Sequence, residues 1–163
     1  MLKSNQKKHL KAGSGKFVVI ASKYNSRYVD AMLRAARAEL KRAGVAGIEV
    51  IRVPGAFEIP AVAARVANIS FMQADSPRAR VAAIICLGVI LRGQTVHAEF
   101  IGRAVTEALM GIQVRCEVPV IHEVLLLENE EQARVRCLDK KFNRGMEAAQ
   151  TALEMSRVMG ALT

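Results

Sequence analysis

The strongest constraint on the fold is a regular alternation of short apolar runs with segments of helical periodicity. Residues 17–21, 48–53, 81–87 and 119–125 are nearly continuous runs of apolar side chains. Such runs predict strands that are buried on both faces, as in a parallel sheet. Strands that alternate with helices favour an α/β fold in which helices cover both faces of the sheet. We therefore expect a four-stranded parallel sheet in a three-layer αβα sandwich.

Between the expected strands, apolar residues recur at helical spacing or alanine is frequent, which predicts helices. Gly44 is typical of a helix end, and Asn129 with Gln132 is typical of a capping box. Residues 69–79 are expected to form a loop and residues 88–95 a turn. The expected helices run from Ser26 to Gly44, Glu58 to Ala67, His97 to Arg115, Asn129 to Leu138 and Asn143 to Met159.

The chain has the length and composition of one globular domain. Of its 163 residues, 52% are hydrophobic and 24% are charged, as in typical folded domains. The net charge is +9, and the first sixteen residues hold five lysines and no acidic residue. We expect residues 1–16 to be a basic flexible tail and residues 17–163 to be a single domain. Binding of a polyanion by the tail is the alternative interpretation.

Composition disfavours several classes of protein. The longest apolar run, Val81 to Leu91, is shorter than the roughly 20 residues of a membrane helix, and the basic start is not followed by a secretory signal pattern, so a cytoplasmic location is expected. Aromatic residues make up 4% with no tryptophan, which disfavours a nucleic-acid module with stacking platforms. The three cysteines form no Cys-x-x-Cys pair. We expect reduced, mostly buried thiols and no metal site.

In parallel α/β sheets, ligands bind beyond the carboxyl ends of the strands. The segment from Gly88 to His97 follows an expected strand and contains two glycines, a threonine and a histidine. Backbone N–H groups at a helix start bind anions, so Gln94 and Thr95 could hold a phosphate, with an ordinary turn as the alternative. His97 suits proton transfer near neutral pH, with a capping or core histidine as the alternative.

Two further features have both a binding and a structural interpretation. Glu58, in the proline-bounded segment 54–60, could hold a ligand or stabilise a helix start. The basic stretch with Arg136, Lys140 and Arg144 could bind a phosphate or form a solvated face. No Ser-His-Asp order, nucleophile elbow or metal-ligand spacing occurs in the sequence, which disfavours covalent and metal catalysis.

In combination, these motifs resemble the lumazine synthase family over residues 17–155. The resemblance implies a flavodoxin-like fold and a transferase of riboflavin biosynthesis that uses no cofactor. The implied reaction condenses 5-amino-6-(D-ribitylamino)uracil with 3,4-dihydroxy-2-butanone 4-phosphate to 6,7-dimethyl-8-ribityllumazine, releasing phosphate and water. The matching motifs are Pro54-Gly-Ala-Phe-Glu-Ile-Pro60, Gly88 to Gly93 with Thr95 and His97, Val118-Pro-Val-Ile121, Glu130-Glu-Gln-Ala133 with Arg136, and Asn143-Arg-Gly145.

The resemblance also implies roles for individual residues. His97 would be catalytic and move protons, while proximity of the two substrates supplies most of the remaining rate. The pyrimidine and its ribityl chain would be bound by Tyr24, Asn25, Ala56, Phe57, Glu58, Val89, Ile90, Leu91 and His122. The phosphate would be bound by Gln94, Thr95 and Arg136, with Lys140 and Arg144 as further candidates.

By the same resemblance, the pocket would form between adjacent subunits of a homopentamer, with a neighbour's residues around His122 on one side. Twelve pentamers can close into a sixty-subunit icosahedral shell, with riboflavin synthase as cargo. Residues 139–144 contain no obvious insertion that would block closure, which favours the shell. His122, Leu126 and Arg144 depart from the common pattern of the family, because an aromatic residue, a more polar residue and a lysine usually stand there.

The main alternative is a non-catalytic container that forms a shell of the same fold and assembles without turnover. A nearer alternative is an enzyme that dismutates lumazine to riboflavin. A basic nucleic-acid binder is the third, and it predicts affinity that falls steeply with salt.

Overall fold

The computed structural model describes residues 15–72 and 80–162. Most of the expected basic tail and of the expected loop at 69–79 therefore lies outside the described residues. Lys16, which the composition assigned to the tail, is the first residue of a strand, and its ammonium group lies 2.6 Å from the Glu49 carboxylate. Among the described residues, no helix is long and apolar enough to cross a membrane.

Four parallel strands form one sheet, as the apolar runs predicted. The strands are β1 (Lys16–Ser22), β2 (Ile48–Val53), β3 (Val81–Leu91) and β4 (Val120–Leu127), in the spatial order β2-β1-β3-β4. The helices are α1 (Ser26–Arg42), α2 (Ile59–Met72), α3 (His97–Cys116), α4 (Glu130–Ala133) and α5 (Arg144–Ala161), with a π-helical turn, η1 (Arg134–Leu138), after α4.

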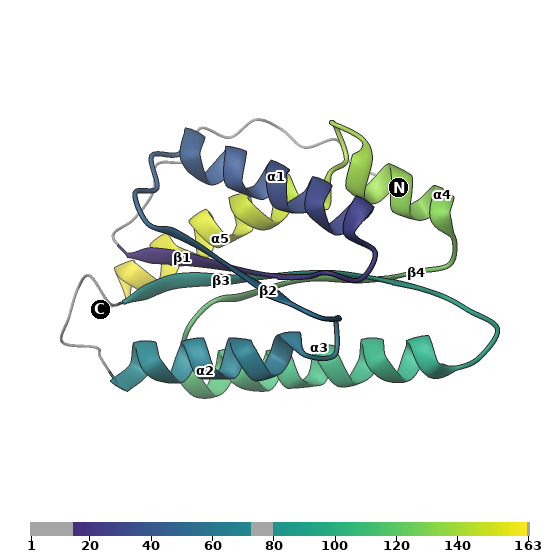
Figure 1. Ribbon diagram of the computed structural model, residues 1–163. Coiled ribbons are helices and arrows are strands. Elements are labelled where there is room, and N and C mark those ends of the chain that lie inside the picture. The colour runs from purple at the N-terminus through teal and green to yellow at the C-terminus, as the bar shows by residue number, and fades with distance from the viewer. Residues whose placement is uncertain (1–14, 73–79, 163) are drawn as a thin grey trace.

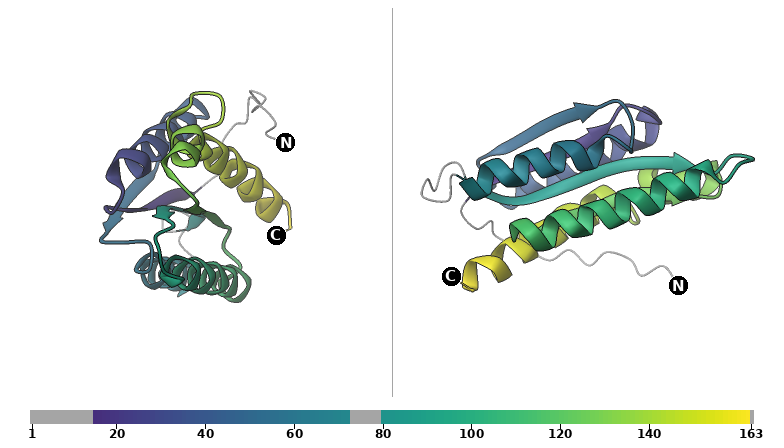
Figure 2. Two further views of the ribbon diagram at one scale, coloured as in Figure 1. Left: turned by 90° about the vertical axis from the view of Figure 1, so that its right-hand side faces the viewer. Right: turned by 90° about the horizontal axis from the view of Figure 1, so that it is seen from below.

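The sheet separates two helical layers, so the predicted three-layer sandwich is confirmed. Helices α1, α4 and α5 cover one face, and α2 and α3 cover the other (Figure 1). Seen from below, α2 and α3 run side by side under the sheet (Figure 2). Alternate residues of β1 serve the two faces: Phe17 and Val19 pack toward α1 and α5, whereas Val18 and Ile20 pack toward α2 and α3. A strand buried on both faces must be apolar throughout, which explains its sequence.

Strand β3 continues through residues that the sequence predicted to form a turn. It was expected to end at Leu87, but Gly88 to Leu91 pair in register with Val124 to Leu127 of β4. A side chain at Gly88 would approach Cγ1 of Val124 to 3.0 Å, so this glycine permits close packing within the strand. The true turn is confined to residues 92–96. Strand β4 likewise runs two residues beyond its expected end.

Two helix predictions also need correction. Helix α2 begins at Ile59 and runs to Met72, so its expected end at Ala67 and the expected start of the loop at residue 69 are wrong. The buried Ser70 hydroxyl accepts a 2.9 Å hydrogen bond from the backbone N–H of Val81, which holds this extra turn against β3.

The helix expected over residues 129–138 is divided into α4 and the π turn η1, closed by a 3.2 Å hydrogen bond from Asp139 N–H to the Arg134 carbonyl. The expected caps are present: Asn129 accepts from the N–H of Gln132 at 3.0 Å, and Asn143 accepts from the N–H of Gly145 at 2.9 Å. The Asn143 amide also donates to the Cys137 carbonyl at the end of η1. This contact between successive elements stabilises the wider turn that local sequence did not indicate.

Helices α1 and α5 come into close backbone contact at Gly145. A methyl group built at Gly145 would collide with the backbone carbonyl of Met32 in the middle of α1. Because that obstacle is backbone, a side-chain movement cannot relieve the clash. By contrast, a methyl group at Gly111 of α3 would meet no atom within 4 Å.

We predict that Gly145→Ala lowers the free energy of unfolding by about 1 to 3 kcal/mol, the usual cost of overpacking. The matched control is Gly111→Ala, which should be stabilising by about 0.5 to 1 kcal/mol because alanine favours a helix. Urea denaturation followed by circular dichroism measures both. Equal effects of the two substitutions would show that the α1–α5 contact is not limited by Gly145.

Candidate functional site

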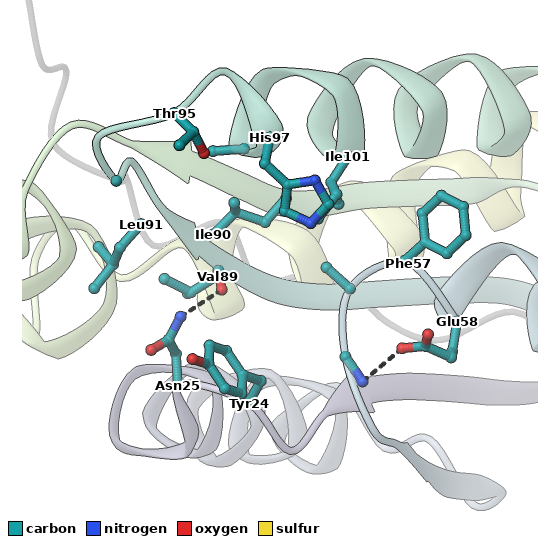
Figure 3. Close-up of a pocket in the computed structure, with 14 residues that line it drawn as sticks. Tyr24, Asn25, Phe57, Glu58, Val89, Ile90, Leu91, Thr95, His97 and Ile101 are labelled. Atoms are coloured by element: carbon teal, nitrogen blue, oxygen red, sulfur yellow. Dashed lines mark hydrogen bonds between the residues drawn. The ribbon is translucent and has the colours of Figure 1, made fainter.

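A cavity of about 750 Å³ opens at the carboxyl edge of the sheet. It lies among the segments that follow β1, β2 and β3 and the first turn of α3, as expected for a parallel α/β sheet. Its volume is that of a pocket for a small organic molecule. Figure 3 shows polar and aromatic side chains from these four segments arranged around the same space.

Asn25 ties the first of these segments to the central strand. It adopts the left-handed conformation, with φ of 54°, and its side-chain amide donates a 2.8 Å hydrogen bond to the Val89 carbonyl. Tyr24 is anchored through its backbone N–H, which donates to the Pro54 carbonyl at 3.0 Å. The Tyr24 side chain itself is 73% exposed. Its ring is thus held at the rim of the pocket and is accessible for stacking on a flat ligand.

Glu58 stabilises the turn after β2. Its carboxylate accepts a 2.8 Å hydrogen bond from the backbone N–H of Gly55 (Figure 3). The predicted start of a helix at Glu58 is therefore wrong, because the residue lies in the turn before α2. The closed turn presents Phe57, which is 62% exposed, at the mouth of the cavity.

His97 is the first residue of α3, and its imidazole points into the cavity (Figure 3). Thr95 and Gly93 line the same wall just before the helix. The positive end of the α3 dipole and the N–H groups of its first turn therefore face the cavity. An anion bound there would lie beside a group that can transfer a proton.

Most of the residues expected to bind a ligand do line this cavity. They are Tyr24, Asn25, Ala56, Phe57, Glu58, Val89, Ile90, Leu91, Thr95 and His97. Sequence reasoning did not propose Ala98 and Ile101 as pocket residues, although Ile101 lies one helical turn after His97 on the same face of α3. The expected ligand-binding residues Gln94, His122 and Arg136, and the candidates Lys140 and Arg144, are not among the lining residues of one chain.

Arg144 forms ion pairs with two carboxylates on the α1–α5 face of the sheet. It lies 3.0 Å from Glu123 of β4 and also pairs with Glu147 of its own helix. Glu123 is buried, and burial raises its pKa to about 7 although Arg144 is adjacent. Arg136 belongs to η1, which packs against α1 and α5 on this same face. These pairs keep Arg144 from binding a phosphate in the described pocket.

His122 lies on the opposite face of β4 and is held as a neutral imidazole. The Thr106 hydroxyl donates to the Gly102 carbonyl at 2.8 Å, so it can only accept at its 2.9 Å contact with His122 Nε2. Nε2 must then carry the proton, which leaves Nδ1 to accept from the Val124 N–H. Burial also lowers the pKa of His122. The ring is therefore a poor proton donor and carries no charge toward a ligand.

The cysteines and the metal-ligating side chains provide no second site in the described residues. Cys86 and Cys137 are buried and Cys116 is partly exposed, and none forms a disulfide. Burial raises the pKa of Cys137 to about 12, so its thiol is unreactive at neutral pH. Within residues 15–72 and 80–162, no group of three His, Cys, Asp or Glu side chains could hold a metal ion.

The parallel sheet and the pocket at its carboxyl edge define an α/β protein built to bind a small molecule. A sequence profile of the 6,7-dimethyl-8-ribityllumazine synthase family matches residues 14–160. A 6,7-dimethyl-8-ribityllumazine synthase of Xanthomonas campestris is 39% identical over 155 residues, covering 94% of this chain and 95% of the relative. One of Stenotrophomonas maltophilia is 39% identical over 151 residues, covering 91% and 92%. The chain therefore belongs to the 6,7-dimethyl-8-ribityllumazine synthase family and is an enzyme.

The buried Glu123 predicts a stability that falls as pH rises. Its pKa is about 7 in the folded chain against an ordinary 4.5, so the folded state binds the extra proton between these values. The free energy of unfolding should then decrease across this pH window, by as much as roughly 3 kcal/mol. Glu123→Gln should abolish that decrease.

Urea denaturation between pH 4.5 and 8 measures the effect. The matched control is Glu107→Gln, which removes the same charge from an exposed pair with Arg103 on α3. A constant difference in stability between the natural chain and Glu123→Gln over this range would show that Glu123 does not titrate there.

Proposed function

We propose that the cavity at the carboxyl edge is the site where this enzyme condenses 5-amino-6-(D-ribitylamino)uracil with 3,4-dihydroxy-2-butanone 4-phosphate. The proposal rests on one observation, which is that residues distant in the sequence meet around a single pocket. Residues from three strand ends and one helix start, separated by more than seventy positions in the sequence, line one pocket of suitable size. The product is 6,7-dimethyl-8-ribityllumazine, so the enzyme acts in riboflavin biosynthesis.

The uracil would occupy the side of the cavity nearest β1. The exposed Tyr24 ring offers a flat surface for the pyrimidine, and the backbone of Val89 to Leu91 offers hydrogen-bonding groups along β3. The ribityl chain would extend toward Phe57 and Glu58, where a carboxylate can accept hydrogen bonds from hydroxyl groups. No metal or organic cofactor is required for this arrangement.

The phosphate would be bound at the start of α3. Gly93 allows the backbone to approach an anion closely, and the Thr95 hydroxyl is a donor on the same wall. Arg136 would supply the second positive contribution. Because Arg136 lies in η1 on the α1–α5 side of its own chain, we propose that it reaches this phosphate from a neighbouring copy.

His97 would transfer protons during imine formation, loss of phosphate and ring closure. Its imidazole points toward the space where both substrates would meet (Figure 3). An amine and a ketone react readily once they are held together, so positioning and proton transfer account for the required catalysis. This modest chemical demand agrees with a site without a serine or cysteine nucleophile among its lining residues.

We propose that the enzyme is a homopentamer with its pockets between adjacent subunits. His122 and Arg136 are separated from the pocket of their own chain, so a second copy is needed to bring them to it. The outer surface of α3 also exposes Phe100, Met110 and Val114, which a neighbouring subunit could cover. The sixty-subunit shell, riboflavin synthase as cargo and a cytoplasmic location are further parts of this proposal.

The direct test mixes the purified protein with both substrates and follows lumazine fluorescence against the uncatalysed reaction. We expect clear acceleration. Sedimentation of the same sample gives the size of the assembly. A protein that assembles but does not accelerate the reaction would contradict the proposal and support the non-catalytic container.

We predict that His97→Ala lowers kcat by about 10²-fold, the lower end of the usual contribution of a general acid–base group. The low value follows because the condensation proceeds slowly without such a group. The control is the sedimentation coefficient, which should stay the same. Unchanged kcat would remove His97 from the catalytic role.

We predict that Arg136→Ala raises KM for the butanone phosphate by about ten- to a hundredfold and KM for the uracil much less. This range corresponds to one charge-assisted hydrogen bond. The matched control is Arg134→Ala, which removes an exposed arginine of the same turn that pairs with Glu131 at 3.2 Å. Equal effects of the two substitutions on KM would contradict a specific phosphate contact.

A further inference from the structure

The turn before α3 has few internal means of holding its shape. Val96 is the N-cap residue of α3 and makes no side-chain hydrogen bond to the first turn. A Cβ atom at Gly93 would meet no atom within 4 Å, so nothing packs against the turn at this position. Nevertheless, Gly93 and Thr95 line the cavity and must be placed accurately to bind a ligand.

Arg92 fastens this turn at its beginning. Its backbone N–H donates to the Leu127 carbonyl at 2.8 Å. Its guanidinium group makes two ion pairs in different directions, from Nη1 to Glu99 and from Nε to Glu128, both at 3.0 Å. One side chain thus joins the end of β3 to the first turn of α3 and to the segment after β4.

The Glu99 carboxylate depends on Arg92. One of its oxygens pairs with Arg92, while the other, Oε2, is buried and has no hydrogen-bond partner among the described residues. Without Arg92, Glu99 would be an unpaired negative charge one turn from the proposed phosphate position. It would then repel the phosphate and leave the turn without its connection to the helix.

We propose that Arg92 is a positioning residue for the phosphate-bearing substrate, which acts through Glu99 and Glu128 rather than by contacting the ligand. The inference rests on the proposed function of the cavity. Arg92 is not among the residues that line the pocket, and both of its pairs point to protein carboxylates. Its role is to hold the anion-binding turn in place and to neutralise the two acids beside it.

Steady-state kinetics of Arg92→Ala should show a rise of about five- to tenfold in KM for the butanone phosphate, with KM for the uracil nearly unchanged. Inhibition by inorganic phosphate should weaken by a similar factor. Arg92→Lys keeps the charge but cannot span both carboxylates, so its effect should be intermediate. The control is Lys16→Ala, which breaks the ion pair with Glu49 at the opposite edge of the sheet and should change neither KM.

A double-mutant cycle with Glu99→Gln separates positioning from direct binding. If Arg92 acts through Glu99, the double variant should be no worse than Arg92→Ala alone, because Glu99→Gln also removes the charge that repels the phosphate. Fully additive effects would overturn the proposal and make Arg92 a ligand of the phosphate. Equal increases in both KM values would also overturn it, because they would indicate a general loss of structure. Absence of turnover in the unmodified protein would instead contradict the proposed function.

Discussion

Parallel pairing of β1 with β3 is the constraint on which the rest of the structure depends. The two strands lie side by side in the centre of the sheet, with Ile20 opposite Cys86 and Ala21 opposite Leu87, all fully buried. Because parallel strands end at the same edge, this pairing brings the segments after them together. The hydrogen bond from Asn25 to Val89 joins the two segments directly across that edge. The pocket is therefore a consequence of sheet topology, to which the residues of each turn add the chemistry.

The sequence predicted most helices and strands because the burial of apolar side chains that stabilises them leaves a pattern in the local sequence. Continuous apolar runs and helical periodicity indicate burial. Gly44, with its positive φ, and Asn129, with its capping hydrogen bond, indicate helix ends. The secondary-structure predictions were wrong where contacts with residues distant in the sequence determine the backbone conformation. Gly88 is a turn signal by itself, but pairing with Val124 of β4 keeps it in a strand. Similarly, the π turn depends on the contact between Asn143 and the Cys137 carbonyl.

The candidate site could be predicted only in part for the same reason. Resemblance to a family identified residues of the cavity wall, because their motifs are short and follow strand ends. It could not show that Arg144 is paired with the buried Glu123, since the two residues are twenty-one positions apart and meet only in the folded chain. Nor could it show that Thr106 holds His122 in its neutral form. Both contacts occupy side chains that could otherwise bind a ligand, and neither contact changes a motif.

We propose above that one complete site combines the cavity of one chain with Arg136 of another. Co-expression of His97→Ala and Arg136→Ala chains tests it most directly, since a shared site can be rebuilt from the intact halves of two defective chains. With equal amounts of both chains and random assembly, about a quarter of the sites should be complete. At a butanone phosphate concentration well below KM, activity should therefore return to about that fraction of the unmodified enzyme. Activity no higher than that of the separate variants, in a mixture shown to co-assemble, would contradict a shared site.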